Sequence, residues 1–255
     1  MKTILVILGL VTMQLSWSQQ TFDWKSLLNN GSTTRLNELL DSIDLGERGN
    51  LFDYYNRTLT ISFNERIIYL EDSYGFDSTF SSWHINTYRI SIIQSKDSIV
   101  FAKVDTIASA FEFDKKVTAP VFEFKSEEKM KKVEDEFQQI YHTMLQWDEL
   151  FNTSIEFGLR CGRTGWNTDE YIDISELVMK RRINRLSKYL SSSCLEKQLF
   201  RIQGFYELKE EGYKIDPSDK ALIDIILAKK GEVIYCRGCI IQRMEMSHFR
   251  EKFIF

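Results

Sequence analysis

The segment YRISIIQSKDSIVFAKV, residues 88–104, decides the fold class of this chain. Apolar and polar residues alternate in its first half, and a second alternating run follows at residues 99–104. A polar cluster at residues 94–98 separates the two runs. Alternation with a period of two is typical of a strand, and two such runs around a polar turn predict a β-hairpin.

Further alternating runs surround this hairpin, from about residue 54 to residue 124. In the run at residues 59–63, Leu59, Ile61 and Phe63 share one face of an expected strand. A short helix is expected before them at residues 33–43, where apolar residues recur at helical spacing. Because the strands follow one another without intervening helices, they favour an antiparallel sheet.

The second half of the chain has the period of a helix. An apolar stripe runs from Met130 to Trp147 and predicts one long helix that ends near Phe151. Further helices are expected at residues 174–190, 194–209 and 217–230, followed by a return to strand. The predicted fold class is α+β: an antiparallel sheet in the N-terminal half and, in the C-terminal half, a helical region with a small terminal β element.

The first residues have the pattern of a secretory signal peptide at residues 1–18. Lys2 precedes a short apolar run, and Ser16 and Ser18 place small residues at the −3 and −1 positions of a cleavage site before Gln19. The run is too short for a membrane span of about 20 residues. We therefore expect export to the periplasm or the extracellular medium, with no membrane span in the mature chain.

The rest of the chain is expected to divide near its middle. Residues 19–124 form a β region with short helices, and residues 125–255 form a helical region that ends in a β-hairpin. The long helix between them leaves one continuous domain as an alternative. The net charge of −4 gives no basic surface for nucleic acid, so no nucleic-acid partner is expected.

Four cysteines carry the sharpest chemical signal: Cys161, Cys194, Cys236 and Cys239. The last two form a C-x-x-C motif, but no helix start follows it, which disfavours a thioredoxin-like redox site. A zinc site with four cysteine ligands is an alternative. In an exported protein, an even number of cysteines favours disulfides. Because long loops give the larger stabilisation, Cys161 and Cys194 are expected to pair with the two terminal cysteines, in either order.

Two surface features are candidates for recognition. Aromatic residues gather among serines and glycine near residues 74–88, namely Tyr74, Phe76, Phe80, Trp83 and Tyr88. Such a segment is a candidate binding surface, although aromatic residues also cover the ends of sheets.

A basic run on one expected helix, Arg181, Arg185 and Lys188, is the second candidate, as a patch for an anionic partner. The alternative is a solvated face whose charge is balanced by glutamates on the next helix.

No catalytic residue can be assigned from the spacing of motifs. The glycine-rich segment at residues 158–165 lacks the spacing and the lysine of a phosphate-binding loop, and no pair of histidines has metal-ligand spacing. We therefore expect no cofactor and no metal. The sequence favours an exported, non-enzymatic protein that binds an envelope or secreted partner. If the protein is of the immunity type, that partner would be a toxin. The alternative is an envelope enzyme, for example a hydrolase, with a site dispersed in sequence.

Overall fold

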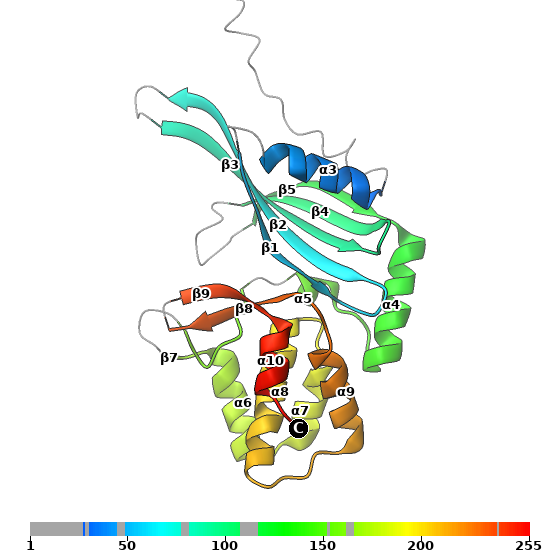
Figure 1. Cartoon of the computed structure of the whole chain (residues 1–255), viewed down its shortest axis with the longest axis vertical. Coiled ribbons are helices and arrows are strands. Elements are labelled where there is room, and N and C mark those ends of the chain that lie inside the picture. The colour runs from blue at the N-terminus through cyan, green and yellow to red at the C-terminus, as the bar shows by residue number, and fades with distance from the viewer. Residues whose placement is uncertain are drawn as a thin grey trace, which may run out of the picture.

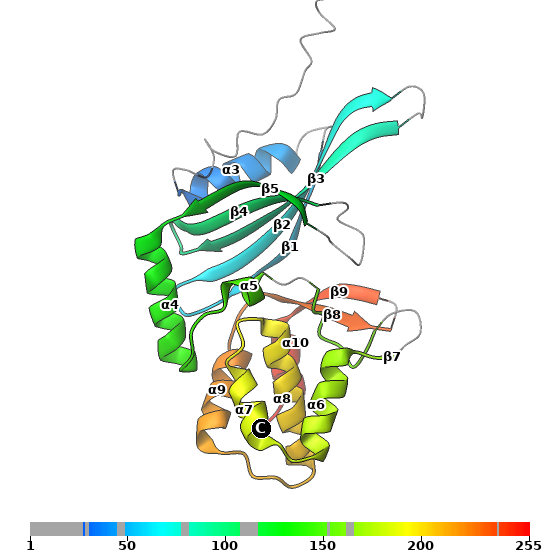
Figure 2. The same cartoon turned by 180° about the vertical axis from the view of Figure 1, so that it is seen from behind.

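The computed structural model describes residues 28, 31–44, 49–77, 82–107, 117–151, 154–161, 166–238 and 240–255. The signal peptide expected at residues 1–18 lies outside these residues. In the described part of the chain, no helix has the length and apolar character needed to cross a membrane. The α+β fold class is confirmed: a sheet fills the N-terminal half, and helices with a small β-hairpin fill the C-terminal half (Figures 1 and 2).

The N-terminal half is a five-stranded antiparallel sheet in which each strand pairs with the next along the chain. Helix α3 (Thr33–Asp44) covers one face of this sheet (Figure 1). The strands are β1 (Gly49–Thr58), β2 (Asn64–Asp77), β3 (Ser82–Gln94), β4 (Ile99–Ile107) and β5 (Val117–Lys125). The order of the strands in the sheet is therefore their order in the chain, which makes the topology a simple meander.

The hairpin expected at residues 88–104 is confirmed as β3 and β4. Ile90 lies opposite Val104, and Gln94 lies opposite Ile99. Ser95 closes the turn, because its backbone N–H donates to the Ser98 carbonyl at 2.9 Å. The local alternation was therefore sufficient to place this pair of strands.

The strand expected at residues 59–63 is wrong, because this segment is the turn between β1 and β2. The Leu59 N–H donates to the Phe63 carbonyl at 2.9 Å, and Ile61 at the tip is 88% exposed. Leu59 and Phe63 are buried in the core beneath the turn. Leu59 and Phe63 anchor the two ends of the turn, and Ile61 lies between them at the exposed tip. Apolar residues at every second position give the same sequence pattern as a strand.

The two faces of the sheet have different partners. The face under α3 is apolar, with Leu36 of the helix packed near Ile68, Ile90 and Val104. The opposite face meets the C-terminal half and combines apolar residues such as Phe101 with charged ones. The second face therefore forms the junction between the two halves of the protein.

The C-terminal half is built around helix α8 (Leu195–Glu210), which lies against its neighbouring helices and the terminal hairpin (Figure 1). Most of α8 is buried on all sides, as expected for a helix in the centre of a domain. The other elements are α4 (Glu127–Tyr141), α5 (Trp147–Leu150), β6 (Arg160–Cys161), β7 (Trp166–Asn167), α6 (Asp169–Met179), α7 (Ile183–Leu190), α9 (Pro217–Leu227), β8 (Glu232–Arg237), β9 (Ile240–Glu245) and α10 (Met246–Lys252).

Two expected helices are broken in the structure. The long helix predicted to reach Phe151 ends at Tyr141, where His142 takes a left-handed conformation with φ of 56°. The helix predicted at residues 174–190 divides into α6 and α7, with Arg181 at φ of 48° between them. In both places, the apolar spacing continues across the break because residues on each side pack on the same core. Periodicity alone therefore could not reveal the interruption.

The chain end also differs from the expected return to strand. After β9, helix α10 packs Met246 and Phe249 into the core, and Phe253 follows one turn later. The hairpin expected around Arg237 and Gly238 is confirmed, since β8 pairs antiparallel with β9.

A close backbone approach joins the two halves at Gly231. This glycine bridges to Arg57 of β1, and the Thr58 N–H donates to the Lys230 carbonyl at 2.9 Å. Gly231 has a φ of +99°, and a Cβ there would lie 2.2 Å from the Asn56 carbonyl oxygen. Glycine is therefore required both by its backbone conformation and by the space available.

We predict that Gly231→Ala destabilises the protein more than Gly212→Ala does. Gly212 also has a positive φ, of +85°, but its Cβ would meet nothing within 4 Å. The control therefore isolates the conformational cost, about 1–3 kcal/mol, and the excess at Gly231 measures the close approach of the two halves. Urea unfolding of both variants gives the two values. Equal destabilisation would contradict a tight junction at Gly231.

Candidate functional site

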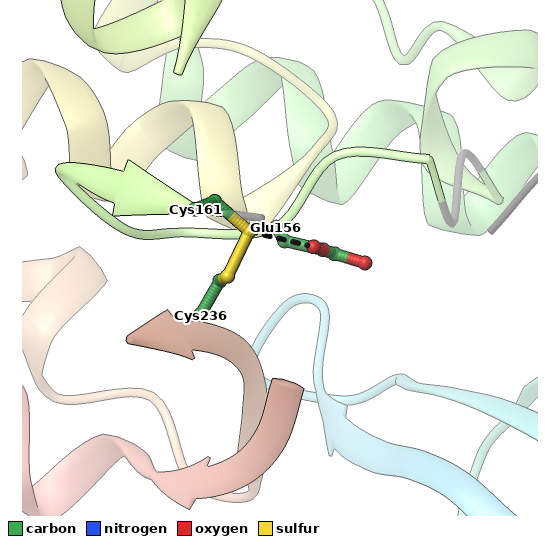
Figure 3. A group of neighbouring side chains, drawn as sticks. All are labelled: Glu156, Cys161 and Cys236. Carbon is green, nitrogen blue, oxygen red and sulfur yellow. Dashed lines mark hydrogen bonds between the residues drawn. A yellow bond between two sulfur atoms is a disulfide. The ribbon is translucent and has the colours of Figure 1, made fainter. Parts of the chain in front are cut away.

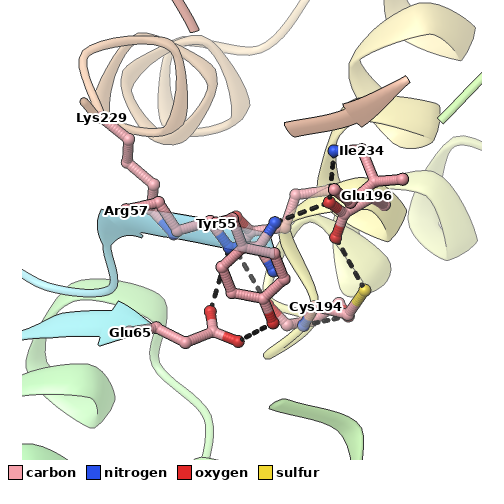
Figure 4. Close-up of polar contacts among 9 residues, drawn as sticks. Tyr55, Arg57, Glu65, Cys194, Glu196, Lys229 and Ile234 are labelled. Carbon is pink, nitrogen blue, oxygen red and sulfur yellow. Dashed lines mark hydrogen bonds and ion pairs between the residues drawn. The ribbon is translucent and has the colours of Figure 1, made fainter. Parts of the chain in front are cut away.

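A buried cluster of charged side chains connects the two halves (Figure 4). One of its members, Arg57, bridges to Gly231 through the backbone. The Arg57 Nε of β1 donates to Glu65 Oε2 at 3.1 Å, and its Nη1 donates to Glu196 Oε1 of α8 at 2.6 Å. All three side chains are at most 2% exposed. Arg57 and Glu65 lie directly opposite each other on β1 and β2, so the sheet presents this pair to the helix.

The cluster extends through Tyr55, two residues before Arg57. The Tyr55 hydroxyl donates to Glu65 Oε1 at 2.5 Å, and the Arg57 guanidinium lies 3.8 Å from the centre of the Tyr55 ring. Glu65 therefore accepts hydrogen bonds on both of its carboxyl oxygens. Bidentate use of a carboxyl group is the arrangement that repays part of the cost of burying it.

Burial dominates the electrostatics of this cluster. It raises the pKa of the Glu65 carboxyl, although Arg57 and Tyr55 act in the opposite direction. It also raises the pKa of the Tyr55 hydroxyl, with Glu65 adding to the effect. Burial by itself would lower the pKa of Arg57, but the carboxylates of Glu196 and Glu65 raise it well above the ordinary value. Arg57 is therefore the fixed positive charge around which the acidic groups are arranged.

Glu196 connects the cluster to the terminal hairpin. Its Oε1 also accepts the backbone N–H of Ile234 in β8 at 3.2 Å, and its Oε2 accepts the Cys194 thiol at 3.4 Å (Figure 4). Two residues further along α8, Gln198 Oε1 accepts the Lys229 ammonium at 3.1 Å. These groups are buried and engaged with one another, so the cluster is arranged to hold β1, α8 and β8 together rather than to present a reactive group.

A second buried ion cluster lies on the same face of the sheet. Asp105 of β4 is fully buried and pairs with Arg89 Nη2 and Lys103 Nζ, each at 3.1 Å. Arg89 lies directly opposite Asp105 in the register of β3 and β4. The sequence analysis missed both clusters, because a charged residue in an alternating strand looks like one that faces water. A signal was present in the cross-strand spacing, but it requires the register of the sheet.

A disulfide between Cys161 and Cys236 ties β6 to β8 (Figure 3). Their Cα atoms are 5.6 Å apart, and they are separated by 75 residues in the chain. Backbone hydrogen bonds accompany this bond, since the Phe157 N–H donates to the Ile234 carbonyl at 2.8 Å and the Cys236 N–H donates to the Phe157 carbonyl at 2.9 Å. The expected long-range pairing of Cys161 with the terminal motif is confirmed.

The expected bridge from Cys194 is not formed, because Cys194 is a free, buried thiol. It stands at the N-cap position of α8 and donates to Glu196 inside the charged cluster. Burial raises the pKa of this thiol well above its ordinary value, which favours the protonated form over the reactive thiolate. Cys239 lies outside the described residues.

Glu156 lies beside the disulfide, so that three side chains with potential metal-ligand atoms come together there. The Glu156 Oε2 is 3.4 Å from Cys161 Sγ, and the donor atoms of Glu156, Cys161 and Cys236 all lie within 4.8 Å of one another. In the described part of the chain, this is the group whose spacing fits a metal ion. The four-cysteine zinc site weighed from the sequence differs from it, since Cys194 lies in the charged cluster instead.

The expected aromatic surface is divided between two places. Tyr74 and Phe76 of β2 and Trp83 of β3 lie near the end of a long hairpin, where Phe76 is opposite Trp83. Tyr88 lies elsewhere: it is buried in the core under α3 and does not belong to an exposed surface. Phe80 lies outside the described residues.

This hairpin extends past the strands on both sides of it. Strand β1 pairs with β2 only as far as Asp72, and β4 pairs with β3 only as far as Thr87. Within the described residues, the segments 73–77 and 82–86 pair with each other and with no further strand. We call these two segments the β2–β3 arm; they project from the body of the protein in Figures 1 and 2.

The expected basic patch does not occupy one helical face. Arg181 lies between α6 and α7, while Arg185 and Lys188 lie on α7. All three are exposed, and Arg181 Nη2 is 3.9 Å from Glu211 Oε2 at the end of α8. A partial balance by a neighbouring glutamate fits the solvated-face alternative, and the role of these residues stays a prediction.

No protein-family model matches this chain, and no curated protein or solved structure shows significant similarity to it. The function must therefore be argued from the geometry of the site.

We predict that Arg57→Met lowers the free energy of unfolding by about 3–5 kcal/mol, because it leaves Glu196 and Glu65 buried without their cation. The matched control is Lys131→Met. Lys131 forms an exposed pair with Asp135 at 2.9 Å, and exposed pairs contribute little to stability because water screens them. Denaturant unfolding at neutral pH compares the two. A similar small effect for both variants would show that the junction does not depend on the buried cluster.

We further predict that Cys161 and Cys236 are linked in the oxidised protein while Cys194 reacts with alkylating reagents only after unfolding. Trypsin cleaves after Arg237 and thus separates Cys236 from Cys239, so non-reducing peptide mapping identifies the linked residue directly. Loss of the bond in Cys161→Ser should cost about 4 kcal/mol on the chain-entropy model, for the observed separation of 75 residues. Cys194→Ser, which keeps a donor for Glu196, should cost less. A Cys194 disulfide in the map would contradict the structure.

Proposed function

We propose that this chain is an exported, non-enzymatic protein that binds a protein partner from the envelope or the extracellular medium through the β2–β3 arm. The observation that carries the proposal is that residues 73–77 and 82–86 pair only with each other among the described residues. The arm thus extends beyond the sheet that supports the rest of the hairpin. Partners of this class include a toxin, if the protein is of the immunity type.

The physical argument starts from the weakness of an isolated ribbon. A two-stranded hairpin without further strands is only marginally stable in water. Its two edges offer unpaired backbone groups, which natural proteins normally cover or block with charge or proline. The arm segments instead contain Tyr74, Phe76, Trp83 and Ile85. With these apolar residues, the ribbon is expected to be more stable when a partner buries it than when it is exposed to water.

The partner that fits the arm best is an extended segment of another protein. The last β2 residue paired with β1 is Asp72, and the last β3 residue paired with β4 is Thr87. The arm begins at the next residue on each side. A partner strand added to either edge of the arm would therefore continue the line of β1 or β4 and extend the same sheet. Backbone hydrogen bonds would supply affinity in this mode, and the aromatic residues would supply contacts of the kind that dominate interfaces.

Two observations support export. The N-terminal residues have the charged start, apolar run and small-residue cleavage pattern of a signal peptide before Gln19. The Cys161–Cys236 disulfide is of the kind that persists in oxidising compartments. The non-enzymatic part of the proposal is supported by the charged cluster at the junction, whose carboxyl groups are buried and engaged by Arg57.

The test is to shorten the arm without changing the rest of the sheet. Replacing residues 73–85 with Asn-Gly joins Asp72 to Asn86, which are opposite each other in the native register, by a two-residue hairpin turn. Tagged full-length and shortened proteins are compared in capture experiments from the envelope fraction of the native host, with mass spectrometry of the retained proteins. We expect a partner that binds the full arm and is lost with it, while the unfolding midpoint changes little.

A point variant sharpens the same experiment. Trp83→Ser should weaken capture, whereas Trp166→Ser should not, although Trp166 is 74% exposed. The captured mature protein should begin at Gln19 in N-terminal sequencing. Equal capture of one partner by the full and shortened proteins would refute binding through the arm, and an intact Met1 in a soluble cytoplasmic pool would refute export.

A further inference from the structure

The Cys161–Cys236 disulfide is held in place by more than its own covalent bond. The backbone of residue 157 exchanges hydrogen bonds with Ile234 and Cys236, and the Gly238 N–H donates to the Arg160 carbonyl at 3.1 Å. Gly158 allows this approach, because a Cβ at that position would lie 2.2 Å from the Cys236 carbonyl oxygen. These contacts come from the backbone, so the two cysteines remain neighbours when the bond between their sulfurs is broken.

Glu156 brings a third ligand atom to the same place (Figure 3). Its Oε2 lies 3.4 Å from Cys161 Sγ. In the disulfide neither sulfur carries a proton, so this sulfur donates no hydrogen bond to the carboxylate. In the oxidised state the two sulfurs and a Glu156 oxygen lie within 4.8 Å of one another. Reduction would turn the two sulfurs into thiols, and thiolates and carboxylates are ligand types that zinc combines in proteins.

We propose that reduction of the Cys161–Cys236 disulfide creates a binding site for a zinc-class divalent cation, with Cys161, Cys236 and Glu156 as ligands. A dithiol reductant supplies two electrons and two protons: the S–S bond breaks, each cysteine gains one proton, and the reductant becomes a disulfide. The cation then replaces both protons on the sulfurs and is bound by two thiolates and the Glu156 carboxylate. The fourth tetrahedral position is left to water or an added ligand.

The position of the site allows an ion to enter. Cys161 and Glu156 are partly exposed, while Cys236 is buried in β8. The same two segments are thus joined by a disulfide under oxidising conditions and by a metal ion under reducing conditions. This inference does not depend on the β2–β3 arm, which belongs to the other half of the protein.

The test uses the full chain with Cys194→Ser and Cys239→Ser, so that Cys161 and Cys236 are the only thiols. This protein is studied oxidised and after reduction with a phosphine, in the absence of oxygen. Zinc is titrated against a chromophoric chelator, and cobalt is used to detect sulfur-to-metal charge transfer. We expect one zinc ion per reduced chain, none in the oxidised chain, and a charge-transfer band only after reduction.

The role of each ligand is separated by further substitutions in the same background. Glu156→Gln leaves both thiols and should weaken zinc binding by about tenfold or more. Cys161→Ser should remove the charge-transfer band of a two-thiolate site and most of the affinity. Circular dichroism of the reduced, metal-free protein checks that it remains folded. No zinc binding by the folded, reduced protein would overturn the proposal, as would equal binding by Glu156→Gln or by the oxidised chain.

Discussion

The charge of Arg57 is the constraint on which the arrangement of the two halves depends. A guanidinium at most 2% exposed is tolerated only where carboxylates reach it, and here one comes from the neighbouring strand and one from the central helix. Because Glu65 is placed by the sheet register and Glu196 by α8, Arg57 reaches both carboxylates only when the two halves are docked, and its Nη2 has no hydrogen-bond partner among the described residues. A buried ion group of this kind is weak evidence for extra stability, but removing one partner is costly. We interpret the cluster as a device that fixes how the two halves dock.

The terminal hairpin is the element on which the other contacts converge. Gly231, which directly precedes β8, bridges to Arg57 of β1. Strand β8 itself donates the Ile234 N–H to Glu196 and carries Cys236, which is bonded to Cys161 of β6. Helix α10 then closes the chain by burying Phe249 against the same core. These contacts come from residues far apart in sequence, so the C-terminal segment links elements of both halves. The charged groups of the junction are buried and bonded to one another, and the β2–β3 arm lies away from them, which is why the arm and not the junction is proposed for recognition.

Sequence patterns predicted much of the architecture where the relevant physics is local. The alternation at residues 88–104 identified β3 and β4, because the pleat of a strand imposes its period directly on the sequence. The same reasoning failed at residues 59–63, where a turn anchored by Leu59 and Phe63 produced a strand-like pattern. It also failed at Arg181, because α6 and α7 pack on one core and keep a common apolar spacing across a left-handed residue.

The sequence by itself determined the α+β class, the central hairpin and the long-range pairing of Cys161 with the terminal motif, since these follow from residue periods and from the entropy of closing a loop. Only the tertiary structure decided which terminal cysteine pairs, why Cys194 stays free, and how Arg57 finds Glu65 and Glu196. The physical reason is that a charge or a thiol has no periodic signature. The register of the sheet and the packing of α8 decide which side chains come within a few ångströms of it. The spacing of residues along the chain does not reveal those neighbours.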